Sequence, residues 1–233
     1  MVEFFLNNKK VVAKDEETIW AVAKREGITL PHLCFADKPG YRADGNCRAC
    51  MVSIEGERVL AASCIRKPTE GMKVLTNDER SIKSRKMVLE LLVTDQPDRE
   101  TSHDPDSHFW KIASDIDVEK SRFEKREKKI VPCEDSSHVA MSVNLDACIH
   151  CNLCVRACRE VQVNDVIGMG NRGHHSKVVF DFNDPMGDSS CVSCGECVQA
   201  CPTGALMESN LLDDNGTKNA CLLYTSPSPR DRG

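Results

Sequence analysis

The sequence predicts an α+β protein in which two cysteine-rich domains flank a helical linker. Three observations lead to this prediction: short strand-like segments near the N-terminus, apolar residues at near-helical spacing in the middle, and a duplicated cysteine motif later in the chain. The 233 residues include 14 cysteines, and only 5% are aromatic. We expect small hydrophobic cores, which bound metal can help to stabilise.

The predicted N-terminal domain, residues 1–77, alternates short strands with one helix. Asn7-Asn8 separates the first two strands, and asparagine tolerates the positive φ of a tight hairpin turn. Asp15 is the expected N-cap of the helix, and Gly27 is its expected C-terminal stop. The expected elements are a hairpin over residues 2–13, a helix over 16–26, a second hairpin over 49–62 and a strand over 73–75.

Residues 78–137 are predicted to form a helical linker. Asn77 or Asp78 can cap a helix that runs to about Val93, because apolar residues recur there at near-helical spacing. The expected apolar face comprises Ile82, Met87, Val88, Leu91 and Leu92. Residues 95–108 are polar and contain proline, which predicts a loop, and a charged helix is expected over residues 109–129.

A duplicated motif dominates the predicted domain at residues 138–208. VNLDACIHCNLCVRAC aligns with GDSSCVSCGECVQAC, and both have Cys-x2-Cys-x2-Cys-x3-Cys spacing. This spacing resembles the run of bacterial ferredoxins, in which the fourth cysteine ligates the other cluster. The resemblance implies a [4Fe-4S] cluster A on Cys148, Cys151, Cys154 and Cys201, and a [4Fe-4S] cluster B on Cys191, Cys194, Cys197 and Cys158. The insertion between the repeats is expected to form a hairpin through residues 177–182.

The remaining cysteine group comprises Cys34, Cys47, Cys50 and Cys64. A [2Fe-2S] centre needs four thiolates that converge on a compact cluster, and this group can supply three from one segment and the fourth from further along. Gly40 and Gly45 permit the backbone to curl around such a cluster. A structural zinc site is the alternative, but zinc sites usually combine two close cysteine pairs, and only Cys47/Cys50 is such a pair.

The other features of the chain limit its function. A net charge of −5 disfavours a nucleic-acid partner. The N-terminus has no export signal and the apolar runs are short, so we expect reduced thiols, a cytoplasmic location and no membrane insertion. No phosphate loop, nucleophilic triad or paired-carboxylate motif stands out, so we expect redox centres without a substrate site. Cys133 has no predicted role, and His103 and His108 are expected to be ordinary polar residues.

The last residues, 221–233, differ in character from the rest. They begin CLLYTSPSPRD, which resembles the translation of a sequencing adapter. We therefore exclude them from fold reasoning and expect the natural reading frame to diverge near Ala220. Residues 209–220 are then expected to lead into a missing C-terminal domain. The alternative is a genuine Pro/Ser-rich tail.

The order of the cysteine motifs resembles the N-terminal region of three related groups of proteins. These are the molybdopterin-dependent, NAD-linked formate dehydrogenase catalytic subunits, the large iron-sulfur subunit of complex I, and the iron-only hydrogenases. The strings PHLC, DGNCRACMVSIEGERVLAASC, SHDPDSHFW and NLDACIHCNLCVRACREVQVNDVIGM look most like the formate dehydrogenase subunit. The resemblance implies a β-grasp [2Fe-2S] ferredoxin domain, a helical linker and a bacterial-type dicluster ferredoxin domain.

By this resemblance, the chain is a fragment that passes electrons from a molybdopterin site, with molybdenum or tungsten, to a flavin/NAD-binding diaphorase-type subunit. The molybdopterin belongs to the missing C-terminal part, and other redox subunits are further expected partners. Complex I and the hydrogenases usually hold one more cluster in the linker through a histidine and three cysteines. Residues 103–110 contain histidines but no cysteines, so we expect that cluster to be absent. The alternatives are a hydrogenase or complex I branch and a stand-alone ferredoxin adaptor.

Overall fold

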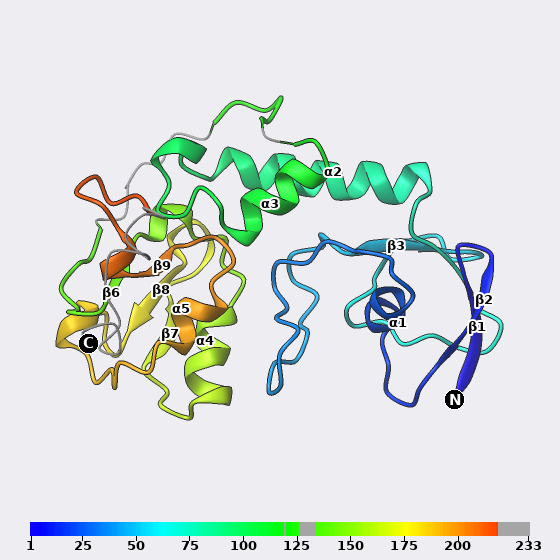
Figure 1. The fold of residues 1–233 in the computed structure, drawn as a ribbon, viewed down its shortest axis with the longest axis horizontal. Helices are drawn as coiled ribbons and strands as arrows, with labels where there is room; N and C mark the ends of the chain where they lie inside the picture. The colour runs from blue at the N-terminus through cyan, green and yellow to red at the C-terminus, as the bar shows by residue number, and fades with distance from the viewer. Residues whose placement is uncertain (119, 126–133, 219–233) are drawn as a thin grey trace, which may run out of the picture. The chain divides into compact units, whose positions relative to one another are not determined.

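The computed structural model describes residues 1–118, 120–125 and 134–218. The chain divides into two compact units (Figure 1). The first unit comprises Met1–Thr94 and Ile112–Glu124, and the second comprises Asp95–Lys111 and Lys125–Gly233. Residues of the predicted linker therefore contribute to both units. Within the described residues, no helix is both long and apolar enough to cross a membrane.

A mixed five-stranded sheet forms the first unit, in the order β2-β1-β5-β3-β4. Its strands are β1 (Val2–Leu6), β2 (Lys9–Ala13), β3 (Met51–Ile54), β4 (Ala61–Ala62) and β5 (Lys73–Leu75). The predicted first hairpin is confirmed, with Asn7 and Asn8 at φ angles of 49° and 66°. β5 runs parallel to β1 and pairs Leu6 with Val74. The sheet and its helix confirm the predicted α+β class.

The helix of the first unit, α1 (Ile19–Arg25), begins later than the sequence predicted. Its N-cap is Thr18, whose hydroxyl accepts a hydrogen bond from the Ala21 N–H at 3.3 Å. Asp15 does not cap the helix but pairs with the N-terminal amino group. Glu16 has a φ of 66°, which is incompatible with a helical start at that residue. The helix therefore begins only where a side chain can satisfy its first N–H groups.

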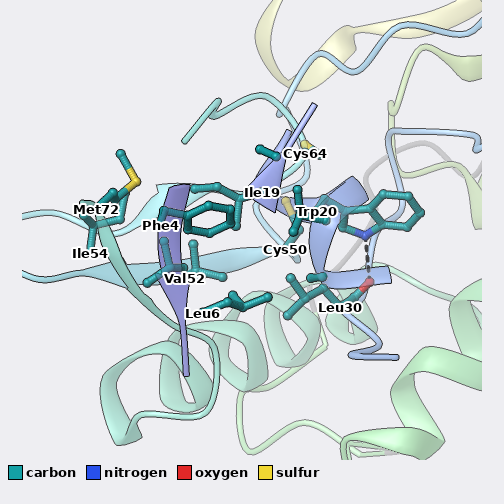
Figure 2. Close-up of a cluster of buried hydrophobic side chains, with 14 of the residues drawn as sticks. Phe4, Leu6, Ile19, Trp20, Leu30, Cys50, Val52, Ile54, Cys64 and Met72 are labelled. Carbon is teal, nitrogen blue, oxygen red and sulfur yellow. Dashed lines mark hydrogen bonds between the residues drawn. The ribbon is translucent and has the colours of Figure 1, made fainter. Parts of the chain in front are cut away.

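The core of the first unit lies between the sheet and α1 (Figure 2). Phe4 and Leu6 alternate with exposed or half-buried residues along β1 and are at most 1% exposed. Trp20 of α1 donates its indole N–H to the Leu30 carbonyl at 3.0 Å. Cys50 and Cys64 belong to the same buried cluster. Two predicted cluster ligands are thus fixed directly in the hydrophobic core.

Two helices follow the sheet. The predicted helix α2 (Glu79–Thr94) is confirmed, and the Asp78 carboxylate accepts from the Ser81 N–H at 3.3 Å at its start. Its predicted apolar face is only partly buried: Ile82 and Leu91 are exposed, and Met87, Val88 and Leu92 are half-buried. The buried residues are Ser81, Leu89 and Val93, which are eight and four positions apart and therefore lie on one side of the helix. The next helix, α3 (His108–Asp115), ends well before residue 129, and residues 126–129 of that prediction lie outside the described part.

The second unit contains two small two-stranded antiparallel sheets and short helices around the duplicated motif. The described elements are β6 (Met141–Val143), α4 (Leu153–Arg156), η3 (Ala157–Val161), β7 (Ile167–Gly170), β8 (Lys177–Phe180), α5 (Glu196–Ala200) and β9 (Leu206–Glu208). β6 pairs antiparallel with β9 and so joins the two ends of the motif. β7 pairs with β8, which confirms the hairpin predicted between the repeats. α4 and α5 occupy corresponding positions in the two repeats.

Candidate iron-sulfur sites

The first cysteine group lies in the first unit, on the loop after α1 and on both sides of β3. Cys34 and Cys50 are fully buried, Cys64 is 3% exposed, and Cys47 is half-buried. The Cys47 N–H donates to the Cys34 sulfur at 3.3 Å. The Ser63 hydroxyl donates to the Cys50 carbonyl at 2.7 Å, which ties the Cys64 segment to the Cys50 segment. The fold therefore brings together residues that are 30 positions apart in sequence (Cys34 to Cys64).

The thiols of this group interact in pairs. A hydrogen bond between the Cys34 and Cys47 side chains raises the pKa of Cys34 and lowers the pKa of Cys47. The Cys50 and Cys64 side chains form a second such pair, in which the pKa of Cys50 is lowered and that of Cys64 is raised. Negative charge on Cys34 and Cys47 also raises the pKa of Cys64. The four sulfur atoms thus share one electrostatic environment, and bound iron would supply the positive charge that four thiolates need.

The loop before Cys47 requires glycine. Gly45 has a φ of +66°, and a Cβ atom at this position would lie 2.9 Å from the Cδ1 atom of Ile65. Gly40 has a φ of +86°, and Arg48, between Cys47 and Cys50, has a φ of 58°. Glycine adopts a positive φ readily, which lets the chain change direction before Cys47. The sequence prediction that Gly40 and Gly45 allow the backbone to curl there agrees with these angles.

The duplicated motif adopts the same backbone geometry in both repeats of the second unit. His150 and Asn152 have φ angles of 53° and 62°, and the corresponding Ser193 and Gly195 have φ angles of 58° and 75°. The N–H of His150 donates to the Cys148 sulfur, and the N–H of Ser193 donates to the Cys191 sulfur, each at 3.4 Å. His150 and Ser193 are neither glycine nor asparagine, so each of their positive φ angles costs about 1–3 kcal/mol. The same backbone strain at equivalent positions indicates that both cysteine loops need this conformation to direct an N–H group toward sulfur.

The sulfur atoms of the second unit gather across the repeats. Burial raises the pKa of Cys154 well above its ordinary value, and negative charge on Cys151, Cys201 and Cys148 raises it further. Burial likewise raises the pKa of Cys197 to about 12, and charge on Cys191, Cys194 and Cys158 contributes. Charge on Cys201 of the second repeat thus raises the pKa of Cys154, charge on Cys158 of the first repeat raises that of Cys197, and charge on Cys197 also contributes at Cys154. These interactions across the repeats are compatible with the exchanged ligands that the bacterial ferredoxin spacing implies.

Two further donors to sulfur come from residues that the sequence analysis did not single out. The Val166 N–H donates to the Cys158 sulfur at 3.3 Å, and the Asn164 side-chain amide lies 3.9 Å from the Cys194 sulfur. Both residues follow Val163, which has a φ of 57° although its side chain is β-branched. N–H donors to sulfur are typical of iron-sulfur sites, where they stabilise the reduced cluster. The donor set therefore fits iron-sulfur clusters.

The described residues contain no group of three or more His, Cys, Asp or Glu side chains arranged to hold a single metal ion. Among the predicted ligands, Cys194 is the exposed one. Cys133 and Cys221 lie outside the described residues.

The linker histidines are placed in different ways. His103 is 2% exposed, and its ring lies 3.2 Å from both the Gly204 carbonyl oxygen and the Glu134 carboxylate. Asp104 forms an ion pair with Lys218 at 3.1 Å. His108 begins α3. His103 is therefore a buried polar residue whose hydrogen bonds connect the linker to the loop after Cys201.

Two families match this chain. Residues 1–79 match the 2Fe-2S iron-sulfur cluster binding domain, and residues 147–205 match the 4Fe-4S dicluster domain. The fold and these matches define the chain as an iron-sulfur protein of the electron-transfer class, with two ferredoxin-type domains. The predicted fold class and the electron-transfer function are thereby confirmed.

The sequence is similar to those of several kinds of oxidoreductase. The chain is 31% identical over 213 residues to an NADP-reducing hydrogenase subunit of Solidesulfovibrio fructosivorans, covering 89% of this chain and 36% of the relative. It is 29% identical over 193 residues to a putative formate dehydrogenase of Staphylococcus haemolyticus, covering 83% and 19%. It is 30% identical over 212 residues to an NADH-quinone oxidoreductase subunit of Rhizobium meliloti, covering 89% and 24%. The predicted resemblance is confirmed: the chain corresponds to the iron-sulfur region of such proteins and spans between 19% and 36% of their length.

A solved structure has the same fold. The crystal structure of an NAD+-reducing [NiFe]-hydrogenase in the H2-reduced state superposes with a TM-score of 0.77 at 24% sequence identity. The match covers 89% of this chain and 87% of the hydrogenase chain. The likeness extends over both ferredoxin-type domains and supports the fold.

Proposed function

We propose that this chain conducts electrons through one [2Fe-2S] cluster and two [4Fe-4S] clusters. Cys34, Cys47, Cys50 and Cys64 hold the [2Fe-2S] cluster. Cys148, Cys151, Cys154 and Cys201 hold cluster A, and Cys191, Cys194, Cys197 and Cys158 hold cluster B. The domains are residues 1–77 for the [2Fe-2S] site, 78–137 for the linker and 138–208 for the two [4Fe-4S] sites.

The observation that carries this proposal is the duplicated loop geometry around the later cysteines. The N–H groups of His150 and Ser193 each donate to the first cysteine of their repeat at 3.4 Å. Both residues hold a positive φ to do so. A disulfide scaffold gives no reason for this repeated geometry, whereas anionic clusters bound at the two cysteine loops accept hydrogen bonds from these N–H groups, and the Cys-x2-Cys-x2-Cys-x3-Cys spacing of both repeats favours [4Fe-4S] clusters over zinc.

The protein supplies the surroundings of the clusters, and each bound cluster supplies a one-electron redox couple. Buried cysteines exclude water from the [2Fe-2S] site, and backbone N–H groups partly offset the negative charge on the sulfur atoms. Cys194 is exposed, which supports cluster B as the cluster nearest to the surface of the second unit. We assign to cluster B the exchange of electrons with a neighbouring redox centre.

The linker is proposed to hold no cluster. The histidine that would serve as a ligand there, His103, is already engaged by the Gly204 carbonyl and the Glu134 carboxylate. These contacts support a structural role, in which His103 stabilises the loop that follows Cys201. Iron content distinguishes the two cases, because a fourth cluster would add about four iron atoms to about ten.

The larger protein is proposed to be a formate dehydrogenase-like oxidoreductase. Two observations support this: the putative formate dehydrogenase of Staphylococcus haemolyticus aligns with 83% of the chain, and the chain spans only 19% of that relative. In this proposal a molybdopterin site, with molybdenum or tungsten, lies in a further domain, and a flavin/NAD-binding subunit in the cytoplasm accepts the electrons. A hydrogenase or NADH-quinone oxidoreductase branch is the second candidate, supported by relatives at 31% and 30% identity.

Two experiments test these levels separately. An anaerobic dithionite titration of the purified chain, followed by EPR, is expected to show one [2Fe-2S] signal and two [4Fe-4S] signals that take up about three electrons in total. Fewer clusters would overturn the proposed relay. Sequencing the gene beyond codon 220 is expected to reveal a molybdopterin-binding domain. A hydrogenase domain or a stop codon there would overturn the formate dehydrogenase assignment and leave the relay intact.

A further inference from the structure

A second buried histidine lies close to the cluster B cysteines. His138 is 7% exposed and precedes β6, and its Nε2 atom lies 2.9 Å from the Ser193 hydroxyl oxygen. Ser193 stands between Cys191 and Cys194 in the second repeat. The contact joins residues that are 55 positions apart in sequence.

The hydrogen bonds of His138 fix the position of its ring proton. The Ala140 N–H approaches the Nδ1 atom at 3.1 Å, and a backbone N–H can only donate. Nδ1 therefore acts as the acceptor and carries no proton. The proton of the neutral ring is on Nε2, which donates to the Ser193 oxygen.

Ser193 needs an anchor because its backbone is strained. It has a φ of 58°, and its N–H donates to the Cys191 sulfur at 3.4 Å. This left-handed conformation is unfavourable for a residue other than glycine. The hydrogen bond from His138 holds the Ser193 side chain and so opposes relaxation of the loop away from Cys191.

Neighbouring contacts fasten the His138 segment to the same region. The Asp135 carboxylate accepts from the Met186 N–H at 2.7 Å, and the Ser137 hydroxyl accepts from the Gly187 N–H at 2.8 Å. A Cβ atom at Gly187 would lie 2.5 Å from the Ser137 carbonyl oxygen, so the two backbones are in close contact. Burial opposes ionisation of Asp135, but the N–H of Met186 and the Ser137 donors outweigh it and lower its pKa. These contacts hold the segment that carries His138 in place beside residues 186–187.

The first repeat lacks this support. His150 occupies the position of Ser193, with a similar φ of 53° and the same 3.4 Å bond to sulfur. Its side chain is exposed, and its ring forms no hydrogen bond with any residue in the described ranges. The two cluster loops thus share a backbone geometry but differ in what holds it.

We infer that His138 is a positioning residue for cluster B: through the Ser193 hydroxyl it holds the loop whose N–H donates to Cys191, and it thereby raises the reduction potential of cluster B relative to cluster A. N–H donors to sulfur favour the reduced, more negative cluster. Loss of the anchor lets the strained loop relax and lengthens the N–H to sulfur contact. The inference rests on the proposed assignment of Cys191 to cluster B, but not on the enzyme to which the chain belongs.

The test is an EPR-monitored redox titration of the full chain and its variants. His138→Phe keeps a ring but cannot donate, whereas His138→Gln keeps an N–H donor near the place of Nε2. Ser193→Ala removes the acceptor and leaves the backbone strain. We expect His138→Phe and Ser193→Ala each to lower the equilibrium constant for reduction of one [4Fe-4S] cluster by about tenfold, because the N–H donor that favours the reduced cluster is weakened. A tenfold change corresponds to about 59 mV for one electron. His138→Gln should restore most of the potential.

The double variant His138→Phe/Ser193→Ala should shift the potential no further than either single variant, because both remove the same interaction. The cluster that shifts should be the one whose signal disappears in Cys197→Ser. Unchanged potentials with full iron content, additive shifts, or a shift of the other [4Fe-4S] cluster would each overturn the inference. If His138→Phe does not assemble, Ser193→Ala decides alone. A parent protein without [4Fe-4S] signals would instead overturn the proposed function.

Discussion

Replacement of Trp20 by phenylalanine tests how the first unit holds its [2Fe-2S] site. The Trp20 indole donates to the Leu30 carbonyl at 3.0 Å, four residues before Cys34. Its ring also packs edge to face against His32 and Phe35, with centroids 4.8 and 5.1 Å apart. The side chain is 6% exposed, so the Leu30 carbonyl would find no water to replace the lost donor. Trp20 therefore fixes the segment that delivers Cys34.

The magnitude follows from the loss of one buried donor. An unsatisfied buried carbonyl costs about 1–3 kcal/mol, which corresponds to roughly 5- to 150-fold more frequent opening of the Cys34 segment. Trp20→Ala would add a cavity cost and remove both aromatic contacts, for a total of about 3–5 kcal/mol. The assay is the rate at which a chelator removes the [2Fe-2S] cluster from anaerobic protein, with the [4Fe-4S] signals recorded as an internal reference.

Trp110→Phe is the matched control. Trp110 is 3% exposed, and its indole nitrogen has no hydrogen-bond partner in the described part of the chain. The same substitution there removes a ring of the same type without breaking a hydrogen bond, so the loss of the [2Fe-2S] cluster should keep the parent rate. An unchanged rate in Trp20→Phe, or equal acceleration in Trp110→Phe, would show that the Trp20 hydrogen bond does not hold the Cys34 segment.

Three further predictions concern the second unit. Cys158→Ser should abolish the EPR signal of the cluster in the second repeat, and Cys201→Ser should abolish that of the cluster in the first repeat. If each substitution instead removes the cluster of its own repeat, the crossed assignment is contradicted. Gly204→Ala should lower the thermal midpoint by an amount equivalent to about 1–3 kcal/mol, because Gly204 has a φ of +74° and an added Cβ would lie 2.6 Å from the Asp104 Cβ. Gly56→Ala is the control, since Gly56 has a φ of +84° but an added Cβ there would meet nothing within 4 Å. The difference between the two variants separates the cost of the backbone conformation from the cost of the clash. Removal of all iron should expose the amides of residues 141–208 to hydrogen exchange. The amides of β1, β2 and β5 should stay protected, because the first unit has a continuous hydrophobic core. Equal loss of protection in both units would contradict this prediction.

Local sequence signals predicted the fold wherever one residue type decides the geometry. Asn7 and Asn8 formed the expected turn because both tolerate positive φ. The start of α1 was wrong because Asp15 and Thr18 are both good caps, and the ion pair of Asp15 with the N-terminus is a tertiary contact. The predicted buried face of α2 was only partly correct because burial depends on what packs against the helix, and Ser81 is buried although it is polar.

The cysteine spacing predicted the sites far better than their surroundings. Spacing limits which sulfur atoms can converge, and the predicted grouping of Cys154 with Cys201 is compatible with the effect of charge on Cys201 on the pKa of Cys154. The donors from Val166 and Asn164 could not, because they depend on positive φ angles at Val163 and Asp165 within the insertion. The contact of His138 with Ser193 spans 55 residues and leaves no periodic signal in the sequence.

We propose that twelve cysteines hold three iron-sulfur clusters. Iron and acid-labile sulfide analysis of anaerobically purified protein, combined with EPR of the reduced state, determines the number and type of these clusters. We expect about ten iron atoms and about ten sulfides per chain, with both [2Fe-2S] and [4Fe-4S] signals. A colourless protein that contains zinc, or no metal and no sulfide, would contradict it.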